Sequence, residues 1–218
     1  MKGLRLYNYW RSSASHRVRI GLELKGLSYE YVPVHLGAGA GEQFSAAYRA
    51  LNPQSRVPSL ETPDGILTQS MAILEWLEET HPQPALLPGA ARERAQVRAM
   101  AQVLVADVQP LQNQSVTRYL QNNLQVDEAA IKQWLHEWIG RGLGTVEQLL
   151  TRGPPEAEFC FGARPTIADI CLVAQCASAR RFGVDLSAYP QVERVDLKCG
   201  AMAAFQRAAP AVQPDAPR

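Results

Sequence analysis

The sequence predicts a mixed fold, with an α/β N-terminal part followed by an all-helical C-terminal part. Two observations support this prediction. Strand-like and helix-like patterns alternate through roughly the first eighty residues, whereas every longer pattern after a proline-rich segment has helical spacing. Alternating strands and helices form a sheet covered by helices, and consecutive amphipathic helices pack against one another. The chain is therefore expected to contain two domains.

The N-terminal part is expected to follow the order strand, helix, strand, helix, strand, strand, helix. Apolar and aromatic residues at positions 4, 6, 7 and 9 predict the first strand, and the helix after it ends at a basic last turn and a glycine stop, Lys25-Gly26. A turn at Pro63-Asp64-Gly65 separates the last two strands. The later elements are expected at residues 29–34, 42–51, 56–60 and 66–68, with a helix from Gln69-Ser70 to before Pro82.

The C-terminal part is expected to be entirely helical. Helices are predicted at about 91–122, 128–150, 166–182 and 190–208, the first of them either continuous or kinked at Pro110. Asp169 follows Thr166 at the spacing of a helix capping box. Three prolines predict a loosely held tail after residue 209. The expected domains are thus residues 1–81 and 91–218, with a linker at 82–90.

Composition excludes several classes of function. The 22 Lys and Arg residues nearly balance the 21 Asp and Glu residues, which argues against a nucleic-acid-binding surface. No apolar run reaches the roughly 20 residues of a membrane span, and no signal-peptide core is present, so a cytoplasmic protein is expected. The four cysteines form no Cys-x-x-Cys pair and the four histidines lack metal-ligand spacing. Buried reduced thiols are expected, and neither a redox dithiol nor a metal site.

Hydroxyl and cationic side chains gather where the first strand is followed by the first helix. Ser12 and Ser13 are good N-cap residues, and Arg17 and Arg19 follow within two turns. The unpaired backbone N–H groups and the positive end of the helix dipole stabilise phosphate, carboxylate or thiolate. The segment is therefore a candidate anion site, although the serines could also act only as caps beside solvated arginines.

Several strings, in the right order, resemble the zeta class of glutathione transferases, which includes maleylacetoacetate isomerase and maleylpyruvate isomerase. These strings are Arg11-Ser12-Ser13-x-Ser15-x-Arg17-Val18-Arg19-Ile20, Asn52-Pro53-x-x-x-Val57-Pro58, Gln69-Ser70, Gln109-Pro110-Leu111-Gln112-Asn113 and Arg181-Phe182-x-Val184-Asp185-Leu186. The resemblance covers about residues 4–214. It implies a thioredoxin-like glutathione-binding domain, an all-helical substrate-binding domain and a homodimer.

The resemblance also implies roles for single residues. Ser12, with Ser13 as the second candidate, would donate a hydrogen bond to the glutathione sulfur and lower the thiol pKa from about 8.5 toward neutrality. A cis peptide bond at Val57-Pro58 would expose backbone groups to the cysteinyl residue of glutathione. The other implied glutathione contacts are Gln69 and Ser70 to the γ-glutamyl carboxylate, Gln43 to the glycyl end, and Gln109, Asn113 and Ser115, which could equally form a solvated face.

The implied reaction is the cis–trans isomerisation of an anionic diketo acid by thiolate addition, bond rotation and elimination. Maleylacetoacetate is the favoured substrate and maleylpyruvate the alternative. Arg11, Arg17 and Arg181 are expected to anchor carboxylates, because guanidinium binds them bidentately, and His16 is a weaker candidate. Ala14 stands where the family commonly has cysteine. A conjugating or dehalogenating transferase and a non-catalytic glutathione-binding protein remain as alternatives.

Overall fold

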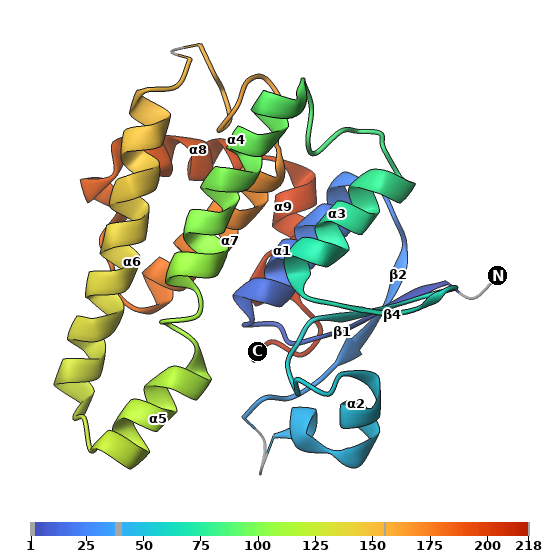
Figure 1. Cartoon of the computed structure of the whole chain (residues 1–218), viewed down its shortest axis with the longest axis vertical. Helices are drawn as coiled ribbons and strands as arrows, with labels where there is room; N and C mark the ends of the chain where they lie inside the picture. The colour runs from blue at the N-terminus through green and yellow to red at the C-terminus, as the bar shows by residue number, and fades with distance from the viewer. Residues whose placement is uncertain (1–2, 38–40, 155, 218) are drawn as a thin grey trace. The chain divides into compact units, whose positions relative to one another are not determined.

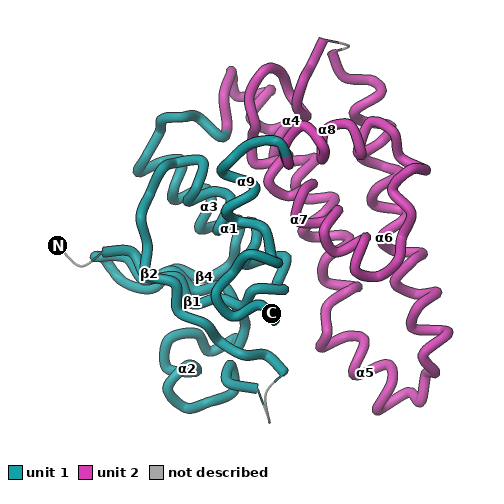
Figure 2. Tube along the Cα trace, turned by 180° about the vertical axis from the view of Figure 1, so that it is seen from behind, with its two compact units in different colours: residues 1–86, 201–218 teal, residues 87–200 magenta. Residues whose placement is uncertain are grey.

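The computed structural model describes residues 3–37, 41–154 and 156–217. The chain divides into two compact units, coloured separately in Figure 2. Unit 1 consists of residues 1–86 and 201–218, and unit 2 of residues 87–200. This division differs from the boundary expected from sequence, since the last eighteen residues pack with the N-terminal unit and not with the helical one.

Unit 1 is built on a four-stranded mixed sheet with the strand order β2-β1-β3-β4. Strands β1 (Leu4–Asn8) and β2 (Tyr29–Pro33) are parallel, whereas β3 (Ser59–Thr62) is antiparallel to β1 and to β4 (Gly65–Thr68). A parallel pair needs a crossover connection, and helix α1 (Ser13–Leu24) provides it between β1 and β2. The order β-α-β-α-β-β-α expected from sequence is therefore confirmed.

The helices of unit 1 lie on both faces of this sheet. Helices α1 and α3 (Ser70–Thr80) lie side by side on one face, and α2 (Ala46–Leu51) lies on the other, after the short 3₁₀ turn η1 (Glu42–Phe44) (Figure 1). A Cβ at Gly21 would lie 2.4 Å from Leu74 Cδ2, so only glycine allows this approach of α1 to α3. Fully buried aliphatic side chains fill the space between these helices and the sheet, namely Leu6, Val18, Ile20, Leu22, Leu60, Ile73, Leu74 and Leu77.

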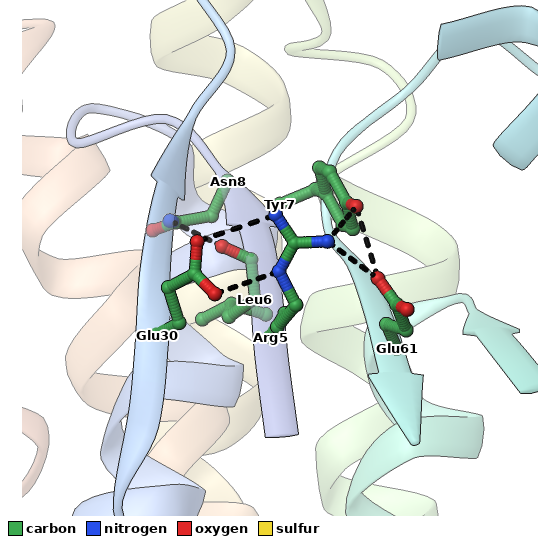
Figure 3. A network of polar contacts seen from close by, with 6 residues as sticks. All are labelled: Arg5, Leu6, Tyr7, Asn8, Glu30 and Glu61. Atoms are coloured by element: carbon green, nitrogen blue, oxygen red, sulfur yellow. Dashed lines mark hydrogen bonds and ion pairs between the residues drawn. The ribbon is translucent and has the colours of Figure 1, made fainter. Parts of the chain in front are cut away.

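Arg5 joins the three neighbouring strands across the sheet surface. Its guanidinium donates to Glu30 on β2 and to Glu61 on β3, with Nε to Oε2 at 2.7 Å and Nη1 to Oε2 at 3.1 Å (Figure 3). Tyr7 OH donates to the same Glu61 oxygen at 3.0 Å. Because Arg5 is partly exposed, this network contributes little to the free energy of folding. Its main effect is to orient the paired strands.

A buried ion pair fixes the end of the N-terminal segment. Lys25 Nζ lies 2.7 Å from Glu78 Oε2, with both side chains almost wholly buried, and it also donates to the Pro84 carbonyl at 2.7 Å. Glu78 Oε2 in turn accepts from Leu86 N at 2.8 Å. Residues 84–86, assigned to a linker from sequence, are therefore held by α3 and by the end of α1.

Unit 2 is helical throughout its regular structure. Its elements are α4 (Ala91–Gln102), the π-helical segment η2 (Val103–Val108), α5 (Gln114–Leu124), α6 (Glu128–Thr151), α7 (Ile167–Arg181), the 3₁₀ turn η3 (Leu186–Ala188) and α8 (Pro190–Gly200). The segment expected at 91–122 is interrupted around Pro110, as one of the two alternatives predicted. The single helix expected at 190–208 is wrong, because α8 ends at Gly200 and α9 (Ala203–Ala208) belongs to unit 1.

Helix α7 begins at the predicted capping box. Thr166 N donates to Asp169 Oδ2 at 2.7 Å, and Cys160 N donates to Asp169 Oδ1 at 2.8 Å. Burial raises the pKa of the Asp169 carboxyl, whereas these backbone donors oppose that rise. The four cysteines, at positions 160, 171, 176 and 199, are all free and buried, as expected.

The C-terminal tail is tied down, so the prediction of a loosely held tail is wrong. Gln213 Nε2 donates to the carbonyls of Arg207 and Ala209 at 2.8 and 2.9 Å. The Asp215 carboxylate accepts from Trp10 N at 3.1 Å and from the Tyr31 hydroxyl. Prolines in a segment indicate that it forms no long helix. They do not show whether the other side chains of the segment form hydrogen bonds with distant residues. Arg218 lies outside the described residues.

Candidate functional site

Ser12 is the N-cap of helix α1. Its Oγ accepts from Ser15 N at 3.2 Å, and its own backbone N–H donates to the Tyr9 carbonyl at 3.0 Å. Because a hydroxyl that accepts one hydrogen bond keeps its own hydrogen, Ser12 can still donate to an anion at the helix N-terminus. Ser13 is the first residue of the helix, and both serines are partly exposed.

Arg17 connects this helix to the N-terminus of α3. Its Nε donates to Ser70 Oγ at 3.0 Å, and both side chains are buried. Arg17 is thus held between the two helices through Ser70, and its expected role as an anchor for a substrate carboxylate stays a prediction. Ser70 accepts from Arg17 and keeps its own hydrogen for a ligand oxygen.

Gln69 precedes α3 with a positive φ of 67°, and its Nε2 donates to Gln54 Oε1 at 2.8 Å. The backbone thus turns sharply into the helix at the position where the sequence predicts a carboxylate contact. The first N–H groups of any helix lack intrahelical partners, and the dipole there favours an anion. The Arg17–Ser70 hydrogen bond joins the second turn of α1 to the start of α3 within unit 1.

The Val57-Pro58 peptide bond is cis, and it directly precedes strand β3. Two buried side chains hold the turn before it. Asn52 Nδ2 donates to the Arg56 carbonyl at 2.8 Å, and Tyr48 OH donates to the same carbonyl at 2.7 Å. The Arg56 carbonyl, which belongs to the peptide bond that precedes Val57, is therefore held by two residues that sequence reasoning did not assign to the site.

Gln43 lies in η1 and is buried, with its amide against Gly41. Gly41 has a φ of 91°, and a Cβ there would lie 2.6 Å from the Gln43 amide, so this close approach requires glycine. Among the described residues no donor reaches Gln43 Oε1. A buried unpaired acceptor is costly unless a ligand or water completes it, which makes Gln43 a plausible contact for a donor group of a ligand.

His16 is a buried neutral imidazole. Its side chain is 2% exposed, and neither ring nitrogen has a hydrogen-bond partner within the described part of the chain. Burial, together with the charges of Arg19 and Arg17, lowers its pKa to about 3. A neutral ring adds no positive charge to the site, so any contact of His16 with a substrate carboxylate, which stays a prediction, would be a neutral hydrogen bond.

Arg11 is the exposed cation next to Ser12. Its guanidinium carbon lies 5.8 Å from the centre of the Trp10 ring and 6.0 Å from that of Tyr9. Cation–π contacts of this kind favour a guanidinium beside an aromatic ring. Of the three arginines expected to bind carboxylates, Arg11 is the one that unit 1 places at the surface beside the helix N-terminus.

The remaining expected residues belong to unit 2. Asn113 is the N-cap of α5, and its Oδ1 accepts from Ser115 N at 3.0 Å and from Ser115 Oγ at 2.9 Å. These two side chains thus satisfy one another at a helix start. Gln109 follows η2 and is partly exposed. Arg181 ends α7 as an exposed residue, with its guanidinium carbon 4.3 Å from the Phe182 ring centre.

Sequence reasoning missed three residues that hold the segment before Ser12, namely Arg19, Tyr31 and Asp215. The sequence offered Arg19 either as a cation at an anion site or as a solvated residue, yet it is fully buried. Nothing in the local sequence around Tyr31 or Asp215 indicates that they meet.

In the described ranges, no helix is long and apolar enough to cross a bilayer, and no group of three or more metal-ligating side chains comes together.

Comparison with known proteins gives consistent results. Residues 6–85 match the family model of the glutathione S-transferase N-terminal domain. The chain is 47% identical over 215 residues to maleylacetoacetate isomerase of Pseudomonas aeruginosa, covering 98% of this chain and 99% of the relative. This match shows that the similarity is not confined to the N-terminal domain.

Solved structures agree over the whole chain. The holo structure of a maleylpyruvate isomerase, described as a bacterial glutathione transferase of the zeta class, has a TM-score of 0.94 at 50% identity and covers 98% of this chain and 100% of its own. Maleylacetoacetate isomerase of Anaeromyxobacter dehalogenans with bound glutathione has a TM-score of 0.88 at 51% identity, covering 99% and 98%. The chain therefore belongs to the glutathione transferase family, among relatives of the zeta class.

Proposed function

We propose that this protein is a glutathione-dependent cis–trans isomerase of maleylacetoacetate, with maleylpyruvate as the alternative substrate. The observation that carries the proposal is the Arg17–Ser70 hydrogen bond, which joins the second turn of α1 to the first residue of α3. We take the starts of these two helices as the anion-binding region. One helix start, capped by Ser12, suits a thiolate, and the other, at Ser70, suits a carboxylate.

The residues of unit 1 fit the three parts of glutathione. Ser70 and the N–H groups of α3 suit the γ-glutamyl carboxylate. The backbone of Val57, next to the carbonyl held by Asn52 and Tyr48, suits strand-like pairing with the cysteinyl residue. Gln43 Oε1, which no donor among the described residues reaches, would accept a donor such as the glycyl N–H.

Ser12 would stabilise the thiolate form of the glutathione sulfur. When bound, glutathione supplies the thiolate that adds to the double bond and later leaves it. A hydrogen bond from the Ser12 hydroxyl and the positive end of the α1 dipole both favour the charged form of sulfur over the neutral thiol. Ser13 is the second candidate for this donor.

Arg11 and Arg17 in unit 1 and Arg181 in unit 2 are each proposed as candidates for binding a substrate carboxylate. Arg11 and Arg181 are exposed and lie beside aromatic rings. Gln109, Asn113 and Ser115 are proposed to lie near the ligands. The relatives named for the two acids are 47% and 50% identical to this chain, so sequence identity does not separate the substrates. We also propose a cytoplasmic homodimer, which light scattering of the purified protein would test.

The proposal is tested by following the near-ultraviolet absorbance of enzymatically generated maleylacetoacetate and maleylpyruvate, each with and without glutathione. Conversion to the trans acid is expected only with glutathione, and Ser12→Ala should reduce it far more than Ser13→Ala. The faster acid identifies the substrate. Saturable glutathione binding without turnover of either acid would contradict the proposal and favour a conjugating transferase or a non-catalytic role.

A further inference from the structure

The segment between β1 and Ser12 is held by residues from the opposite end of the chain. Asp215 Oδ2 accepts from Trp10 N at 3.1 Å, and Asp215 Oδ1 accepts from the Tyr31 hydroxyl on β2. Trp10 and Asp215 are 205 positions apart in sequence. The tail thus reaches across unit 1 to a backbone group two residues before the N-cap of α1.

Arg19 holds the same segment from the other side. It is fully buried, and its Nη2 donates to the Trp10 carbonyl at 3.0 Å. Its Nη1 donates to Asn8 Oδ1 at 2.9 Å and approaches the Tyr9 carbonyl at 3.4 Å, while Nε donates to the Ala208 carbonyl at 3.0 Å. The guanidinium therefore satisfies acceptors from both β1 and the end of α9.

Together the two residues fix both polar backbone groups of Trp10. Its N–H is bonded by the Asp215 carboxylate and its C=O by the Arg19 guanidinium. The Tyr9 carbonyl beside it accepts the Ser12 N–H at 3.0 Å. Any movement of Trp10 would therefore shift the turn on which the Ser12 hydroxyl is presented.

Several charged and titratable groups face this network. Burial lowers the pKa of Arg19, whereas Tyr31, Tyr29 and Asp215 oppose that change. The charge of Arg19 in turn helps to lower the pKa of the buried His16, and Glu23 helps to raise that of Tyr29. Tyr31 has its pKa raised by burial and by its hydrogen bond to Asp215, so its hydroxyl remains protonated and continues to donate. The arrangement thus consists of a cation, a carboxylate and neutral phenols that face one another inside unit 1.

We propose that Asp215 is a positioning residue for the glutathione thiolate, because it fixes the backbone of Trp10 and so the direction of the Ser12 hydroxyl. This inference rests on the proposed role of Ser12. Asp215 touches neither glutathione nor substrate in this account. A misplacement of about 1 Å in a reacting group can cost about 100-fold in rate, so loss of one anchor of the turn has a measurable effect.

The test compares Asp215→Asn with wild type and with Glu23→Gln. An amide side chain in place of the carboxylate leaves one acceptor oxygen where two donors must be satisfied. Glu23 is the matched control, since its carboxylate also joins α1 to the C-terminal segment, through Arg207 Nε at 2.6 Å, without contacting the turn. Tyr31→Phe removes only the hydroxyl that orients Asp215. If Asp215→Asn does not fold, the same measurements are made on Tyr31→Phe.

Two measurements are made on each variant. Hydrogen exchange at the Trp10 amide reports whether the turn has loosened, and ultraviolet titration of enzyme-bound glutathione reports its thiol pKa without any diketo acid. Asp215→Asn should speed exchange, raise the bound thiol pKa and lower kcat by about 10-fold or more with little change in KM for the diketo acid. Glu23→Gln should match wild type, and Tyr31→Phe should fall between them.

The outcomes separate this inference from the proposed function. If wild type does not isomerise either acid but Asp215→Asn raises the bound thiol pKa, the proposed function fails and the positioning role stands. If wild type isomerises and Asp215→Asn exchanges faster at Trp10 with unchanged thiol pKa and kcat, the positioning role is overturned. Unchanged exchange in Asp215→Asn and Tyr31→Phe would overturn it as well.

Discussion

Arg17 Nε donates to Ser70 Oγ at 3.0 Å, and this bond joins two residues that are 53 positions apart in sequence, one in the second turn of α1 and the other at the start of α3. Both side chains are buried. An arginine in this position contributes positive charge to the start of α3 and orients the hydroxyl that the proposed function assigns to glutathione. We therefore propose that Arg17 also supports glutathione binding.

Replacing Arg17 should weaken glutathione binding. Hydrogen bonds to charged groups contribute about 1.5–3 kcal/mol, so Arg17→Gln is expected to raise the glutathione dissociation constant by about 10-fold or more. Titration calorimetry measures it, with circular dichroism to verify the fold. Arg207→Gln, which removes an exposed arginine from α9, is the matched control. Unchanged affinity in a folded Arg17→Gln protein would contradict this role.

The Lys25–Glu78 pair should be important for stability. Removing one member of a buried pair leaves an uncompensated charge, so Glu78→Ala is expected to lower the free energy of unfolding by about 3–5 kcal/mol. Glu78→Gln should cost less, because it retains an acceptor for Leu86 N. Urea denaturation measures both. The exposed pair Glu137–Arg141 is the comparison, and Glu137→Ala there should cost under about 0.5 kcal/mol.

His16 should make the protein sensitive to acid. Its pKa is about 3 in the folded protein and about 6.5 when unfolded, so the unfolded state binds a proton more readily. The destabilising effect of this difference in pKa is therefore absent above about pH 6.5. Below that pH the free energy of unfolding decreases toward pH 3, with a slope approaching about 1.4 kcal/mol per pH unit. Urea denaturation at pH 7 and pH 5 should show a smaller difference for His16→Leu than for wild type. An equal difference would mean that the imidazole is protonated in the folded protein.

Two buried glutamines should behave as a coupled pair. Gln112 and Gln175 exchange amide hydrogen bonds at 3.0 and 2.9 Å, which joins the break after η2 to the middle of α7. Gln175→Leu leaves the Gln112 amide unsatisfied and is expected to cost about 1–3 kcal/mol. In a double-mutant cycle, Gln112→Leu with Gln175→Leu should cost less than the sum of the single changes. Strict additivity would show that the amides do not interact in solution.

Local features of the fold were predictable from sequence. The strand and helix order of unit 1, the N-terminal cap at Ser12 and the capping box at Thr166 and Asp169 each depend on neighbouring residues, and the structure contains all three. Short-range hydrogen bonds and apolar spacing decide such features. The cis bond at Val57-Pro58 agrees with what the family resemblance implied.

The pairings across long sequence distances were not predictable. Arg17, Arg19 and Asp215 are charged residues that sequence patterns place at the surface, yet each has polar partners elsewhere in unit 1. Burial of a charge is decided by whether such partners arrive in three dimensions, and a single sequence does not show this. The division of 190–208 into α8 and α9 has a similar origin, because the packing of α9 on α1 separates two segments of similar helical spacing.

The most direct test of the central claim compares glutathione with S-methylglutathione, which keeps the tripeptide but has no ionisable thiol. Maleylacetoacetate and maleylpyruvate are each supplied to the purified wild-type protein, and formation of the trans acid is followed by absorbance. We expect the protein to turn over at least one acid with glutathione and neither acid with S-methylglutathione. S-methylglutathione should also inhibit the reaction competitively against glutathione. Equal turnover with S-methylglutathione, or turnover without any thiol, would contradict thiolate catalysis at the start of α1.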